Sequence, residues 1–194
     1  GGNDHAADGA LERAIDRLDV AHVDAILCVG DLVDGEGDVD RVVSILQASR
    51  VLTVRGNRDR WLLEDRLRDL PGVTLRSEVA AGTLIWLAGL PPTADVETAE
   101  GRLLLCHGVA GNDMRRLLPD DSDYALEAND ELQSVLRDRR HAWMVCGHTH
   151  QRMVRDFGRL TAVNPGALSA TEEPGFAVLD VVDRAVVFHD LRGP

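Results

Sequence analysis

Residues 143–150 read WMVCGHTH, an apolar run of four residues that ends in a glycine and a His-x-His pair. A short, continuous apolar run is typical of a strand that is buried on both faces. Side chains two residues apart in an extended segment point the same way, so the imidazoles of His148 and His150 can face one ligand. The stretch therefore predicts a buried strand that delivers metal-binding side chains at its carboxyl end.

Three further segments have the same form. Residues 25–31 read AILCVGD and end at Asp31, residues 51–59 read VLTVRGNRD and contain Asn57, and residues 103–108 read LLLCHG and contain His107. Ligands of open α/β sheets bind at the carboxyl ends of the strands, and glycine permits sharp turns there. One such segment is an ordinary turn signal. Four of them in one chain indicate a metal centre.

The candidate ligands combine one carboxylate, one amide and three imidazoles: Asp31, Asn57, His107, His148 and His150. Magnesium sites are dominated by oxygen ligands and water. A mixed oxygen and nitrogen set therefore favours Mn, Fe, Zn, Co or Ni.

The chain alternates apolar runs with stretches of helical periodicity, which predicts one α/β domain over residues 1–194. We expect strands over residues 25–29, 51–54, 83–88, 103–106, 143–146, 160–163, 176–182 and 185–189. Helical patterns lie around residues 11–18, 42–46 and 132–136, and another is expected from Arg60 to the turn at Pro71-Gly72. The closely spaced last two strands indicate an antiparallel hairpin.

Composition narrows the class of protein. The net charge is −12 and aromatic residues make up only 4%, which argues against a nucleic-acid partner because polyanions are repelled and stacking surfaces are few. The cysteines, Cys28, Cys106 and Cys146, lie in apolar runs without CxxC spacing, which predicts free thiols. We find neither a leader peptide nor an apolar run of membrane-spanning length, so we expect a cytoplasmic protein without a membrane partner.

The four segments resemble the motifs of the calcineurin-like metallophosphoesterases. The family pattern is Asp-x-His, Gly-Asp, Gly-Asn-His-Asp/Glu, His and Gly-His-x-His. The matches here are Gly30-Asp31, Gly56-Asn57-Arg58-Asp59, His107 and Gly147-His148-Thr149-His150, and Asn164-Pro165-Gly166 is similar to the small phosphodiesterase branch. The resemblance implies two packed β-sheets flanked by α-helices, a four-layer αββα sandwich.

The resemblance also implies two divalent metal ions and hydrolysis of the phosphate mono- or diester of a small substrate. Asp31 would bridge the ions. Asn57, His107 and His148 would bind the second ion, and His150 would complete the first. Paired ions clamp phosphoryl oxygens and lower the pKa of water between them. The catalytic candidates are Asn57, Arg58 and His148. The alternative function is a non-catalytic scaffold or binding module, because the family also contains a member that serves mainly in protein binding.

One departure from the family concerns the Asp-x-His motif, which is absent from its expected setting at the end of an apolar strand. Either the sequence begins after that strand, or Asn3-Asp4-His5 is a degenerate remnant in which His5 stands at the motif's histidine. In both cases the first ion lacks its usual aspartate.

The other departure is Arg58, which stands where the family has its catalytic histidine. Arginine stays protonated and is a poor general acid, but it neutralises phosphate charge through paired donors. We therefore expect substrates with good leaving groups, such as aryl phosphoesters. The next residue, Asp59, either caps the following helix or orients a metal ligand.

Overall fold

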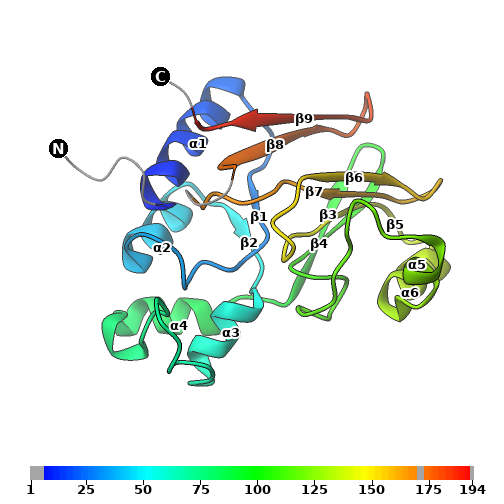
Figure 1. Ribbon diagram of the computed structural model, residues 1–194. Helices are drawn as coiled ribbons and strands as arrows, with labels where there is room; N and C mark the ends of the chain where they lie inside the picture. The colour runs from blue at the N-terminus through cyan, green and yellow to red at the C-terminus, as the bar shows by residue number, and fades with distance from the viewer. Residues whose placement is uncertain (1–6, 170–172, 193–194) are drawn as a thin grey trace.

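The computed structural model describes residues 7–169 and 173–192, which form four layers in the order α, β, β and α (Figure 1). Helices α1 (Ala7–Ala21) and α2 (Val39–Ala48) pack on one side of a layer made by β1 (Leu27–Cys28) and β2 (Leu52–Thr53). This layer also contains the hairpin of β8 (Gly175–Asp180) and β9 (Ala185–Asp190). The expected four-layer αββα sandwich is confirmed.

The third layer is a five-stranded sheet in the order β3-β4-β5-β7-β6. Its strands are β3 (Thr93–Thr98), β4 (Gly101–Cys106), β5 (His141–Val145), β6 (Met153–Asp156) and β7 (Thr161–Asn164). The central strands β4, β5 and β7 are parallel, and the outer strands are antiparallel to their neighbours. The carboxyl ends of β4 and β5 therefore lie at one edge.

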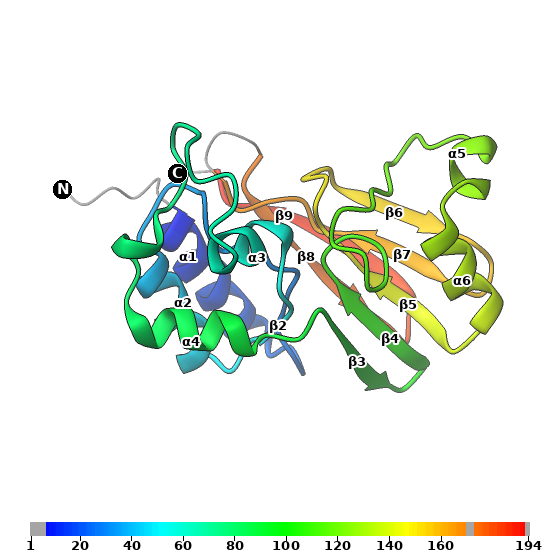
Figure 2. The ribbon, with the colours of Figure 1, turned by 90° about the horizontal axis from the view of Figure 1, so that it is seen from below.

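Both faces of the central strands are buried, which explains the nearly continuous apolar sequences of β4 and β5. Leu103, Leu105 and Val145 face the first sheet layer, where they contact the cluster that includes Leu27 and Leu179. The opposite face packs against α5 (Asp123–Glu127) and α6 (Asp130–Asp138), which lie together on that side in Figure 2. Alternate residues of each strand thus reach different cores.

The predicted strand over residues 83–88 is wrong, because this segment belongs to helix α4 (Ala81–Gly89). Thr83 and Leu87 are buried and lie four residues apart, whereas Ile85 is 74% exposed. A short apolar run does not distinguish a strand from a helix by periodicity, and the β-branched residues favoured the wrong choice. In the structure the helix packs Leu87 against a core that contains Val33 and Leu62.

The helix predicted from Arg60 to Pro71-Gly72 is shorter than expected. Helix α3 spans Asn57–Leu63, so it begins at a candidate ligand and ends well before the proline. A 3₁₀ turn, η1 (Arg76–Glu78), follows before α4. Strands β3 and β6 were not predicted. No helix in the described part of the chain is both long enough and apolar enough to cross a membrane.

Candidate metal centre

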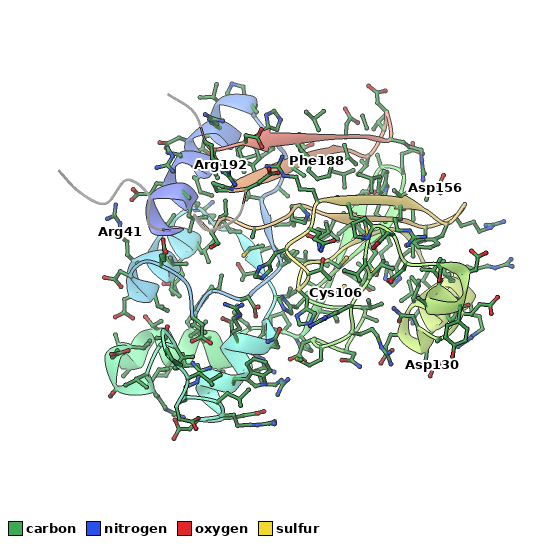
Figure 3. The ribbon with its side chains drawn as sticks, in the orientation of Figure 1. Arg41, Cys106, Asp130, Asp156, Phe188 and Arg192 are labelled. Carbon is green, nitrogen blue, oxygen red and sulfur yellow. The ribbon has the colours of Figure 1, made fainter. Side chains whose placement is uncertain are left out.

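Four strand ends bring their polar side chains together at the edge where the two sheet layers meet. Asp31 follows β1, Asn57 follows β2, His107 follows β4 directly, and His148 follows β5. Cys106, labelled in Figure 3, marks the end of β4 just before His107. One ligand atom from each of Asp31, His107 and His148 lies within 4.8 Å of the others. Asn57 Oδ1 lies 2.9 Å from His107 Nε2 and 2.8 Å from His148 Nδ1.

The hydrogen bonds of His107 fit a bound cation. Its Nδ1 lies 2.6 Å from the carbonyl oxygen of Val29, which only accepts, so Nδ1 carries the proton. In the neutral ring Nε2 is then unprotonated and carries a lone pair. It faces Asn57 Oδ1 at 2.9 Å and Asp31 Oδ1 at 3.4 Å. Three acceptors that converge in this way repel one another unless a cation lies between them.

His148 supplies a second sign of the same fit. Its buried Nε2 has no hydrogen-bond partner among the described residues, while Nδ1 points at Asn57 Oδ1. Burial, and then the neighbouring His107, lower the pKa of His148. The imidazole is therefore neutral near neutral pH, which is the form that binds metals. The residues present thus match a divalent ion with mixed oxygen and nitrogen ligands.

The backbone around these ligands is strained. Asp31 has φ of +58°, His148 of +65° and His150 of +60°, all in the left-handed region. A side chain in this region costs about 1–2 kcal/mol per residue. Gly56 is required for a different reason, since a Cβ there would collide with the nitrogen and carboxylate of Asp31. Strain of this kind clusters at functional sites.

Comparison with protein families gives a match over residues 4–184 to the calcineurin-like phosphoesterase superfamily domain. The chain belongs to this superfamily. No curated protein matches its sequence significantly.

Solved structures of low sequence identity share the superfamily fold. The hypothetical protein PH1004 from Pyrococcus horikoshii OT3 superposes with a TM-score of 0.78 at 15% identity, over 100% of this chain and 85% of that chain. The phosphoesterase YfcE from E. coli superposes with a TM-score of 0.53 at 19% identity, over 97% of this chain and 95% of that chain. A single mutant of Vps29 from Entamoeba histolytica superposes with a TM-score of 0.52 at 18% identity, over 93% of this chain and 88% of that chain.

Arg58, which stands where the motif resemblance leads us to expect a histidine, lies against the candidate centre. The backbone N–H of Arg58 donates to Asp31 Oδ1 at 2.9 Å, and its Nε lies 3.4 Å from Asp31 Oδ2. Its Nη1 donates to the carbonyl oxygen of Asp34 at 3.1 Å. The side chain of Arg58 is therefore directed at the centre, although it remains 37% exposed.

His150 is not brought into the cluster that Asp31, His107 and His148 form. It lies two residues beyond His148 and is half-buried, but its ring contributes no atom to the group within 4.8 Å. Asp4 and His5, the remaining candidates for the first ion, lie outside the described residues. The candidate ligands that the described part of the chain brings together are thus Asp31, His107 and His148, with Asn57 beside them.

Asp59 makes hydrogen bonds that fit both of the roles that its sequence position allowed. It is fully buried and accepts hydrogen bonds from the N–H groups of Gly56 and Leu32, each at 2.8 Å, and of Asp31 at 3.0 Å. The bond to Gly56 caps α3, and the other two fix the loop that holds Asp31. Burial first, and then the charge of Asp31, raise the pKa of Asp59 to about 6.

We expect Asp59→Asn to weaken Mn²⁺ binding about 10–100-fold, as is typical when the group that orients a ligand is lost. The asparagine keeps the size but turns an amide N–H₂ toward backbone donors, so unfolding free energy should also fall by about 1–3 kcal/mol. Calorimetric titration and urea unfolding measure the two effects. Asp38→Asn, at the N-cap of α2, is the matched control because asparagine caps equally well. Equal Mn²⁺ affinities in both variants would contradict the role of Asp59.

Other contributors to the site were not predicted from the sequence. Asn164 is fully buried, and its Nδ2 donates to the carbonyl oxygen of Gly147 at 2.8 Å and to Thr149 Oγ1 at 3.0 Å, which fixes the loop around His148. Arg116 is exposed, and its charge helps to lower the pKa of His148. Asn164 was noted only as part of a motif, and no local signal distinguished Arg116 from a surface arginine.

Proposed function

We propose that the chain hydrolyses phosphate mono- or diesters with a divalent metal ion as cofactor. The observation that carries the proposal is the convergence of Asp31, Asn57, His107 and His148, in which both imidazoles face Asn57 Oδ1 and the buried Nε2 of His148 has no partner among the described residues. A divalent ion bound there polarises phosphoryl oxygens and lowers the pKa of water. Membership of the phosphoesterase superfamily supports a general role of this kind.

The protein's own side chains provide positive charge for the phosphate. Arg58 lies beside Asp31 with its side chain partly exposed, and the charge of Arg116 reaches His148. Neither arginine donates a proton near neutral pH. We therefore propose that the substrate is a small phosphoester with a good leaving group, such as an aryl ester. The net charge of −12 repels a nucleic acid.

The donor set supports Mn, Fe, Zn, Co or Ni as the metal, and we propose Mn for the first test. The sequence also led us to expect a second ion, for which the described residues bring together no further group of ligands. Cys28, Cys106 and Cys146 are free thiols, which is consistent with the cytoplasmic location that we propose.

Metal removal tests the function directly. We expect protein treated with a chelator to lose hydrolysis of bis(p-nitrophenyl) phosphate and of p-nitrophenyl phosphate, and added Mn²⁺ to restore it. The rate of p-nitrophenolate release measures the effect. A rate that is the same with and without the metal would contradict the proposal.

A binding module is the second candidate, and Arg58 is the observation that favours it. A superfamily domain in which arginine replaces the catalytic histidine lacks a general acid at that position. Protein that binds Mn²⁺ but hydrolyses neither a mono- nor a diester would support this alternative.

A further inference from the structure

The two carboxylate oxygens of Asp31 face different groups. Oδ1 lies 3.4 Å from His107 Nε2 and accepts the N–H of Arg58, on the side of the converging ligands. Oδ2 lies 3.4 Å from Arg58 Nε. The carboxylate therefore has a site for a metal ion on one side and a guanidinium on the other.

The guanidinium is held in this position by a fixed acceptor. Arg58 Nη1 donates to the carbonyl oxygen of Asp34 at 3.1 Å. The side chain of Asp34 accepts two hydrogen bonds from Arg68, at 2.7 and 2.9 Å, and one from the N–H of Thr74 at 2.9 Å. The side chains of Asp34 and Arg68 are each only 8% exposed. The backbone that anchors Arg58 is thus fixed by a buried network.

The charge of Arg58 is permanent, since a guanidinium is not deprotonated in proteins. A second divalent ion beside Asp31 Oδ2 would lie a few ångströms from this charge and would be repelled. The ligand atoms that the described residues bring within 4.8 Å of one another come from Asp31, His107 and His148, and the Asp31 oxygen that faces His107 Nε2 is Oδ1.

We infer that the guanidinium of Arg58 takes the place of a second metal ion beside Asp31, so that the centre binds one divalent ion. This inference rests on the proposed metal centre and deepens it. The arginine supplies a fixed positive charge where a phosphate oxygen would otherwise meet the second ion. In the described part of the chain its Nη2 has no hydrogen-bond partner, so it remains available to a substrate oxygen.

The test is the number of Mn²⁺ ions bound, measured by calorimetric titration together with electron paramagnetic resonance. We expect the full chain to bind one equivalent and to show the hyperfine signal of an isolated ion. Arg58→Gln removes the charge and keeps a polar side chain. It should strengthen binding of a second equivalent at least about tenfold, because the repulsion between neighbouring like charges is relieved. Arg58→Lys keeps the charge and should still bind one equivalent.

The matched control is Arg116→Gln, which removes another positive charge near His148 and should leave the stoichiometry at one. Two equivalents of similar affinity and a spin-coupled signal in the unaltered chain would overturn the inference. So would an Arg58→Gln variant whose second equivalent binds no more tightly. One bound ion without hydrolysis would contradict the proposed activity but support this inference, and two bound ions with hydrolysis would do the reverse.

Discussion

His148→Ala should abolish metal-dependent phosphoester hydrolysis and weaken Mn²⁺ binding by more than about 100-fold. Loss of a group that merely orients a ligand lowers metal affinity about 10–100-fold. Loss of a ligand itself should therefore lower the affinity by more than this. His148 points its Nδ1 at the position shared with Asn57 Oδ1, and alanine offers no donor atom there. Calorimetric titration and the release of p-nitrophenolate measure the two losses.

The matched control is His22→Ala. His22 also has a positive φ, of +53°, so alanine meets the same backbone strain as at position 148, where φ is +65°. His22 is exposed, and it is not among the described residues that form the metal cluster. The control should keep its affinity for Mn²⁺ and its activity. Wild-type affinity in His148→Ala would exclude this histidine as a ligand, whatever the activity of the variant.

Arg68→Met should lower the free energy of unfolding by about 3–5 kcal/mol, the range for breaking one partner of a buried ion pair. The Arg68 guanidinium makes two hydrogen bonds with Asp34, at 2.7 and 2.9 Å, and both side chains are 8% exposed. Methionine would leave the Asp34 carboxylate buried without its positive charge. Urea unfolding followed by circular dichroism measures the change.

Two further variants test whether the loss of stability comes from the buried charge. Arg66→Met removes an exposed arginine that lies 3.5 Å from Glu64, and it should change stability by no more than about 1 kcal/mol. The double variant Arg68→Met/Asp34→Asn removes the buried charge as well and should recover part of the loss. A loss in Arg68→Met no larger than in Arg66→Met would show that the buried pair contributes little.

Much of the fold could be predicted because it depends on local pattern. The apolar runs over residues 103–106 and 143–146 lie within or just past β4 and β5, since a strand buried on both faces has a nearly continuous apolar sequence. Helix α4 was missed because the same kind of run also suits a buried helix. Strand β3, with the sequence TADVET, is polar at alternate positions and lies at a sheet edge, so it carried a weak signal.

The candidate site was predicted in part for a related reason. Asp31, Asn57, His107 and His148 each stand beside a glycine or directly after an apolar strand, and the structure brings all four together. His150 shares the same motif but is not part of the cluster. The alternation of an extended strand was assumed to continue through residues 148–150, whereas the backbone at both histidines is left-handed.

The sequence by itself determined the superfamily, the strand ends and four candidate metal ligands, because strands and tight turns are encoded by neighbouring residues. Only the tertiary structure decided what surrounds those side chains. Asp59 accepts hydrogen bonds from the backbone N–H groups of Asp31 and Leu32, which are 28 and 27 residues away in the sequence. Arg58 donates its backbone N–H to Asp31, which is 27 residues away. Whether an arginine lies in solvent or beside the carboxylate of a candidate ligand depends on where a distant loop is placed. Contacts between residues so far apart in the sequence arise from packing of the layers, so they cannot be predicted from periodicity along the chain.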